Sequence, residues 1–290
     1  MIFLFLINKI SNFNLISSFF YLNPGNLTPF VGFIILAIIN HKLFKMKRIF
    51  YTLFLFSICA NLNSQIIQTR VLYVETENVK EFESAVAKKT QMFNGKGSKE
   101  KWFTFKILTG PNAMNYSRVR LAEDLSELDY QNKKGNEYWF KNVPHTSGTQ
   151  YTWRRNNEAS YITGNYDGIN HRRIVFVSYK YSKRKDFWTF RYRIKKVLEK
   201  MQQPYNRGVF SLISGGSRPN VVMIRYLYKS YEEEQNWREN EVPKIKSTYK
   251  ELFGDEAWEM DYTMYRESMV EDWGMTRHHT FMPELSSPRD

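Results

Sequence analysis

Hydrophobic positions follow a strand period and then a helix period along the first part of the chain. The segment 70–75 (RVLYVE) is rich in β-branched and aromatic residues, which predicts a strand. After residue 78 the apolar period becomes helical, with one face formed by Val79, Phe82, Val86 and Phe93. Segments 102–108 and 116–121 predict two more strands on either side of a turn with the sequence TGPN.

The same order returns about a hundred residues later. Segment 173–179 (RIVFVSY) predicts a strand, and the next helix has an apolar stripe made of Phe187, Phe190, Ile194, Val197 and Met201. Segments 209–213 and 221–228 predict strands on either side of a Gly-Gly turn. Ser230 and Glu233 form a capping-box pattern that opens a further helix.

The last predicted strands of the two repeats are also similar to each other. Residues 151–155 (YTWRR) are similar to residues 262–266 (YTMYR), so both segments are predicted to be strands. The chain therefore divides into two β-α-β-β-α-β units, residues 65–168 and residues 169–290 with a C-terminal tail. In the first unit, residues 123–150 show only a short helical pattern near 125–128, followed by a polar loop.

This order of elements resembles the dimeric α+β barrel superfamily, in which two ferredoxin-like units join their sheets into one barrel. The resemblance covers about residues 70–270 and implies an α+β fold in which a single chain supplies both halves of the barrel. The superfamily contains haem-degrading monooxygenases, small-molecule isomerases and stress-related proteins. The resemblance therefore implies an architecture rather than one function.

The segment 46–64 has the pattern of a secretory signal peptide. Its positive start, Met46-Lys47-Arg48, precedes the apolar run 49–60, and a polar stretch ends at Ser64. We expect cleavage before Gln65 and export to the periplasm or beyond. The apolar run has about 12 residues, fewer than the roughly 20 that a membrane-spanning helix needs, so no stable membrane span is predicted. Residues 1–45 are interpreted as an upstream extension from a misassigned start codon.

Removal of residues 1–64 would change the charge of the chain. Five of its 42 Lys and Arg residues and none of its 29 acids lie there, so the mature chain would carry 42 − 5 = 37 basic residues and a formal charge of 37 − 29 = +8. The only cysteine, Cys59, would leave as well, which excludes disulfides and thiol catalysis. Export makes nucleic acid an improbable partner, whereas a basic surface is compatible with an acidic surface ligand.

Motifs for catalysis and metal binding are sparse. No zinc-type histidine spacing and no GxSxG occurs, so we predict neither a metal site nor serine hydrolysis, and no cofactor. Consecutive residues of a strand point to opposite faces, so His278 and His279 would not share an ion. His145 and His171 are candidate general bases. The turn 214–218 (SGGSR) is interpreted as a connection between strands.

The interior of the predicted barrel is the best place for a site. We expect strand residues to line a pocket there, and the candidates are Arg118, Arg120, Arg225, Tyr262 and Arg266. Arginine offers a fork for an acidic group and tyrosine a flat apolar face, so a planar or acidic small molecule is the expected ligand. Our leading interpretation is an exported, non-enzymatic binding module. The alternatives are a monooxygenase-like or isomerase-like enzyme and a surface protein that binds polyanions.

Overall fold

The computed structural model describes residues 65–164 and 166–289, and the predicted signal peptide and upstream extension lie outside them. The first unit contains β1 (Ile66–Tyr73), α4 (Val79–Phe93), β2 (Trp102–Ile107), β3 (Tyr116–Ala122), α5 (Lys133–Asn142) and β4 (Ser147–Arg155). The second contains β5 (His171–Tyr179), α6 (Arg184–Lys200), β6 (Arg207–Ser214), β7 (Val221–Tyr228), α7 (Tyr231–Asn240), α8 (Val242–Phe253), α9 (Ala257–Ser268) and β8 (Met269–Phe281).

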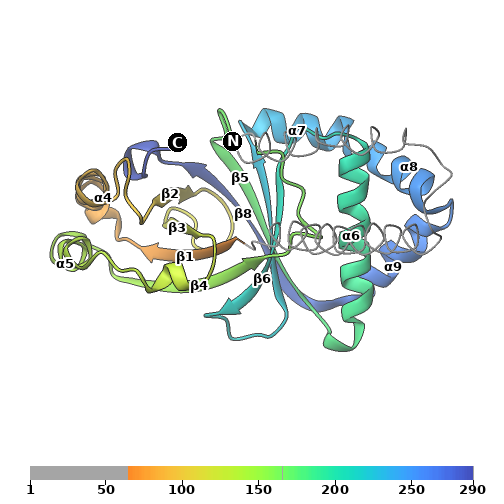
Figure 1. The fold of residues 1–290 in the computed structure, drawn as a ribbon, viewed down its shortest axis with the longest axis horizontal. Helices are drawn as coiled ribbons and strands as arrows, with labels where there is room; N and C mark the ends of the chain where they lie inside the picture. Colours follow the sequence, from red (N-terminus) through yellow and green to blue (C-terminus); the bar gives the residue numbers. More distant parts are fainter. Residues whose placement is uncertain (1–64, 165, 290) are drawn as a thin grey trace, which may run out of the picture. The chain divides into compact units, whose positions relative to one another are not determined.

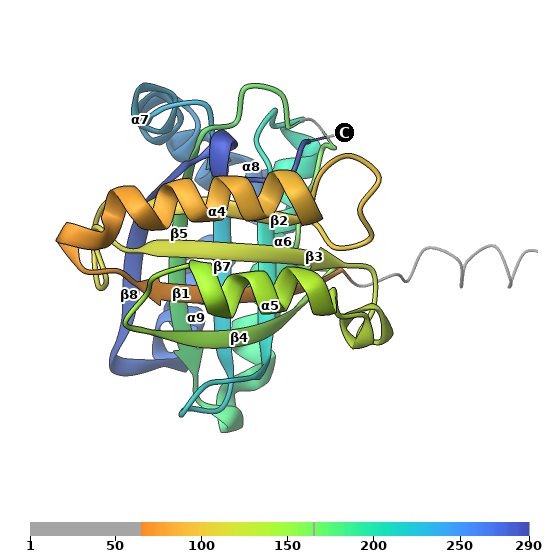
Figure 2. The same cartoon turned by 90° about the vertical axis from the view of Figure 1, so that its left-hand side faces the viewer.

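The described strands close into one barrel in the order β1-β3-β2-β8-β5-β7-β6-β4, in which β4 also pairs with β1. All pairs are antiparallel, and the two units meet where β2 pairs with β8 and β4 with β6. Helices α4 and α5 cover the outside of the first sheet, and α6, α8 and α9 lie outside the second (Figure 1). Strands of the first unit run across those of the second (Figure 2). The predicted tandem α+β barrel is therefore confirmed.

Three apolar clusters hold these layers together. One lies between the second sheet and its helices, and includes Phe187, Phe190 and Val197 from the predicted stripe of α6. A second lies between the first sheet and its helices, around Phe82 and Val86 of α4. The third fills part of the barrel interior. Since the strands have helices on one face and the barrel interior on the other, both faces of each sheet are buried, as the apolar runs indicate.

Two segments differ from the prediction. Residues 262–266 belong to helix α9 rather than to a strand, because the face with Ala257, Asp261, Tyr265 and Ser268 has helical spacing and is buried. Asp261 accepts a hydrogen bond from the Tyr249 hydroxyl at 2.5 Å, which joins α9 to α8. The final strand is β8, which occupies most of the predicted tail. Part of the predicted polar loop of the first unit is helix α5, whose first turn is capped by Asn132.

Among the described residues, every helix is too short or too polar to span a membrane.

Candidate functional site

The barrel encloses a cavity of about 210 Å³. Seven strands contribute side chains to it, and only β2 does not. Successive strand residues point to opposite faces, so every second residue lines the cavity, as Arg172, Ile174 and Phe176 do on β5. The β6–β7 turn adds Gly216, Ser217 and Arg218 at one end. The predicted pocket inside the barrel is therefore present.

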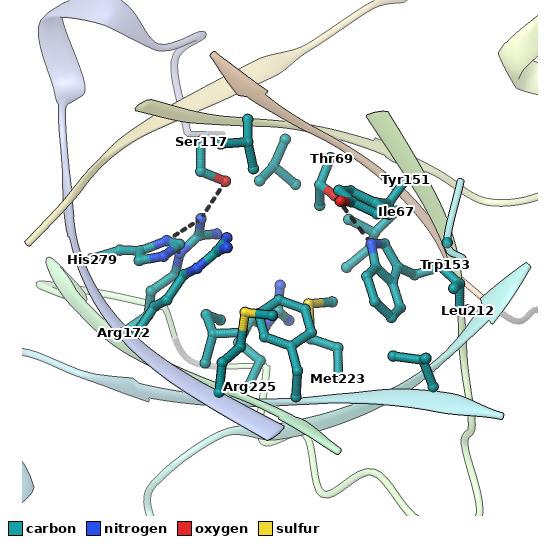
Figure 3. Close-up of a pocket in the computed structure, with 18 of the residues that line it drawn as sticks. Ile67, Thr69, Ser117, Tyr151, Trp153, Arg172, Leu212, Met223, Arg225 and His279 are labelled. Atoms are coloured by element: carbon teal, nitrogen blue, oxygen red, sulfur yellow. Dashed lines mark hydrogen bonds between the residues drawn. The ribbon is translucent and has the colours of Figure 1, made fainter. Parts of the chain in front are cut away.

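Aromatic and aliphatic side chains form much of the cavity wall (Figure 3). The Trp153 ring lies 5.6 Å from the Phe176 ring between centroids, and Trp153 Nε1 donates to Thr69 Oγ1 at 3.0 Å. This bond satisfies the indole N–H and fixes the ring against the interior. Ile174 and Met223 are also buried in this wall. Flat apolar surfaces of this kind suit a planar ligand.

A polar group lies on the side of the cavity formed by β3, β5 and β8 (Figure 3). The Arg172 guanidinium donates to His279 Nδ1 from Nε at 3.0 Å and from Nη2 at 2.8 Å, and Nη2 also reaches Ser117 Oγ at 3.1 Å. Burial lowers the pKa of His279 well below its usual range, and the charge of Arg172 adds to this effect. A neutral imidazole whose Nδ1 accepts must carry its proton on Nε2, so His279 is a hydrogen-bond donor at that atom.

Two more arginines project into the cavity, the half-buried Arg225 and the buried Arg277. The guanidinium of Arg225 lies 5.1 Å from the Phe210 ring centroid, and that of Arg277 lies 5.6 Å from the Phe176 centroid. The Nε atoms of both lack a hydrogen-bond partner among the described residues. Burial lowers the pKa of each guanidinium, and no aspartate or glutamate is among the residues that line the cavity. The cavity therefore carries positive charge without a carboxylate to balance it.

Of the five predicted ligand-binding residues, Arg225 alone lines this cavity. Arg118 and Arg120 are on the opposite face of β3 from Ser117 and Val119, so they point towards the helices and not inward as predicted. Arg118 lies over the rings of Trp102 and Trp139 at 5.4 and 4.8 Å from their centroids. Arg120 donates to the backbone carbonyls of Glu127 and Tyr130 at 2.6 and 3.1 Å.

The other two predicted residues are on α9, outside the barrel. Tyr262 stacks on Trp258 with 5.5 Å between centroids, and Arg266 borders a shallow groove beside the start of β8. The two histidines predicted as candidate general bases, His145 and His171, do not line the cavity. His145 lies against Trp139, and His171 lies outside the barrel beside Glu234.

Sequence reasoning missed Arg172, Arg277 and His279 as cavity residues. Arg172 lies one residue before the predicted strand 173–179, and Arg277 and His279 lie in the predicted C-terminal tail. Strand alternation through 171–179 and 269–281 was the signal that could have found them, because all three share a face with apolar cavity residues.

Comparison with known proteins supports the fold. No family model matches the chain, and no curated protein matches it. A monooxygenase-like protein from Lactobacillus acidophilus has a similar structure, with a TM-score of 0.51, 11% sequence identity, and coverage of 75% of this chain and 94% of that one. An anthrone oxidase-like protein gives a TM-score of 0.47 at 9% identity, covering 77% of this chain and 93% of its own. Chlorite dismutase from Candidatus Nitrospira defluvii gives 0.46 at 7% identity, covering 76% and 92%.

The chain thus has the fold of the dimeric α+β barrel superfamily, with both halves supplied by one polypeptide. The prediction of a non-enzymatic module is contradicted, since the similar structure from Lactobacillus acidophilus is described as a monooxygenase-like protein. This likeness favours the enzymatic alternative over the leading interpretation.

Proposed function

We propose that this protein is an enzyme that binds a small, planar, anionic substrate in the barrel cavity and stabilises negative charge on the substrate oxygen. The observation that carries the proposal is a set of three guanidinium groups, on the buried Arg172 and Arg277 and on the half-buried Arg225, that face an aromatic cavity without a lining carboxylate. Burial lowers the pKa of the Arg225 guanidinium, and no aspartate or glutamate is among the groups that shift this pKa. An anionic substrate would supply the missing counter-charge.

The electrostatics of the cavity favour the ionised form of a weak acid. Nearby positive charges lower the pKa of a bound phenol or enol, because they stabilise its oxyanion. The Nε2–H of His279 adds a neutral donor, held in this tautomer by Arg172. In this arrangement Arg225 and Arg277 bind the oxyanion or a carboxylate, Arg172 orients His279, and the aromatic wall excludes water.

A phenolate or enolate is electron-rich at carbon and can be protonated there, which is isomerisation, or react there with O₂, which is oxygenation. In the oxygenation of a phenol to a quinone, one atom of O₂ becomes the new carbonyl oxygen and the other leaves as water, and the substrate supplies all four electrons. The likeness to a monooxygenase-like protein supports oxygenation as the reaction class for this chain. Hydroxylated aromatic compounds are therefore the proposed substrates.

The barrel cavity and the spaces between each sheet and its helices are too small for a haem, and the larger space of about 550 Å³ beside the start of β8 is the shallow groove that Arg266 borders. The barrel cavity of about 210 Å³ is below the roughly 300–1,000 Å³ of pockets for drug-sized ligands. The spaces between sheet and helices, beside Arg207 and beside Arg118, are about 10 Å³ each. No step of the proposed reaction is assigned to a haem.

Titration with 4-nitrophenol tests this proposal, because its phenolate absorbs visible light and its neutral form does not. At a pH below the phenol's own pKa, we expect binding to produce the phenolate spectrum. Arg225→Met should weaken binding by about tenfold or more, as expected for loss of a charge-assisted hydrogen bond. Arg184→Met, which changes an exposed arginine of α6, is the matched control and should bind as the wild type does.

Oxygen uptake then tests the reaction class. With hydroxylated naphthalenes and anthracenes as substrates, we expect substrate-dependent O₂ consumption that Arg225→Met reduces. Phenolate binding that is absent, or that is equally strong in Arg225→Met, would contradict the assigned site. Binding without oxygen uptake from any of these compounds would contradict oxygenation.

A further inference from the structure

A second polar cluster lies outside the barrel, where β5, β8 and α7 meet. His171 begins β5, His278 lies near the end of β8, and Glu234 projects from the first turn of α7. Glu234 Oε2 is 2.9 Å from His171 Nε2 and 3.3 Å from His278 Nε2. The three ligand atoms all lie within 4.8 Å of one another. His171 and Glu234 are buried, and the His278 side chain is 20% exposed.

The two oxygens of Glu234 have different neighbours. Oε1 accepts from Arg238 Nη2 at 2.6 Å and lies 3.3 Å from Arg173 Nε. Oε2 has its two short contacts with the imidazoles. The arginines therefore fix the carboxylate through one oxygen and leave the other directed at both histidines.

The donor set matches that of known metal centres. Two imidazole nitrogens and one carboxylate oxygen form the protein ligands of catalytic zinc sites and of some iron(II) sites, which keep a further position for water. Metal–ligand bonds of about 2.0–2.2 Å in tetrahedral geometry place neighbouring ligand atoms little more than 3 Å apart, close to the separations of Oε2 from the two histidines.

Neighbouring groups orient these ligands as in a metal site. Thr109 Oγ1 is 2.9 Å from His278 Nδ1, and Thr109 thus fixes the ring with Nε2 towards Glu234. The ring of His171 is held by Tyr231, 4.0 Å away between centroids. A partner such as Thr109, on the ring nitrogen of His278 that does not face Glu234, sets the tautomer and orientation of a metal ligand.

We infer that His171, Glu234 and His278 form a binding site for one divalent transition metal ion of the zinc class. The ion would join α7 to β5 and β8, and its open position would face solvent beside His278. The site is separate from the cavity and does not depend on the proposed reaction.

Cobalt(II) titration of chelator-treated protein tests the inference. We expect one Co²⁺ per chain, visible absorption bands of a low-coordinate site, and displacement by Zn²⁺. His278→Ala should weaken Co²⁺ affinity by at least about tenfold, whereas His145→Ala, which removes a histidine outside the cluster, should leave it unchanged. Circular dichroism of both variants checks that they fold.

Two results would overturn the metal site. One is the absence of saturable Co²⁺ and Zn²⁺ binding to the folded wild-type protein. The other is equal affinity in wild type and in folded His278→Ala. Either result would leave the cluster as a hydrogen-bonded ion pair between α7 and the sheet. Because 4-nitrophenol binds at a different place, chelator treatment should not change its affinity, which keeps this test distinct from that of the proposed function.

Discussion

The guanidinium of Arg172 and the imidazole of His279 face each other inside the barrel, with both Nε and Nη2 of the arginine directed at Nδ1 of the histidine. β5 and β8 hold this contact, because Arg172 and His279 are directly opposed in their antiparallel register. A histidine that accepts from a cation in a buried site cannot easily gain a second proton. Its charge state therefore connects the cavity to the stability of the fold.

Acidification should destabilise the protein through His279. Its folded-state pKa lies well below that of the unfolded chain, chiefly through burial and then through Arg172. The unfolded state therefore binds a proton that the folded state does not, once the pH falls below about 6.5. The contribution of His279 to the free energy of unfolding is fully present above that pH. Each pH unit below it lowers the free energy of unfolding by about 1.4 kcal/mol until the folded-state pKa is reached.

Urea unfolding at a series of pH values checks this expectation. His278 acts in the same direction, because burial lowers its pKa as well, so a single-site variant is needed. His279→Gln keeps an acceptor for Arg172 but does not titrate, and should flatten the pH dependence below about 6.5. An unchanged pH dependence in this variant would contradict the assignment of the effect to His279.

Glu234 titrates at lower pH than His279. Its pKa is lowered to about 2, so its contribution to the free energy of unfolding is lost only as the pH falls from about 4.5 towards 2.

Replacing a cavity arginine by methionine should stabilise the protein while it impairs binding. Arg277 is 8% exposed, and its Nε has no partner among the described residues. Burying an uncompensated charge is costly, so Arg277→Met should raise the free energy of unfolding by about 1 kcal/mol or more. Thermal and urea unfolding measure this change. Arg184→Met, at the surface, should stay within about 0.5 kcal/mol of wild type. A destabilised Arg277→Met would show that the guanidinium has a structural partner.

The β6–β7 turn at the cavity requires glycine at position 215. Gly215 has φ +98°, and a Cβ there would be 2.2 Å from the backbone oxygen of Gln150. Gly215→Ala should cost about 3 kcal/mol or more, since β4 and the turn would both have to move. Gly97 has φ +79° with open space around it, so Gly97→Ala carries only the backbone strain, about 1 kcal/mol. Equal losses of thermal stability in the two variants would show that the close approach is unimportant.

Export stays a prediction from the segment 46–64. We expect the exported protein to begin at Gln65, and mass spectrometry of the N-terminal peptide from the fractionated host would measure this directly. A chain in that fraction that begins at Met1 or at Met46 would contradict cleavage by a signal peptidase.

The sequence by itself determined the two-unit architecture. Hydrophobic periods of 2 residues in strands and 3.6 residues in helices are local properties of the sequence. Neighbouring residues were therefore enough to predict the segments around β5, α6 and β7 and the order of the repeat. It also determined that His278 and His279 lie on opposite faces, which holds in β8, where His279 faces the cavity and His278 faces Glu234. The pairing of two such units into one barrel followed from the resemblance.

Tertiary structure decided which face of each strand is the interior. Both faces of these strands are buried, so the apolar pattern does not distinguish Ser117 from Arg118, and the predicted arginines of β3 were assigned to the wrong side. Packing against α6 and α8 made 262–266 helical despite its β-prone residues, which moved the final strand into the supposed tail. The cluster of His171, Glu234 and His278 draws on three separate elements, so no spacing in the sequence could reveal it.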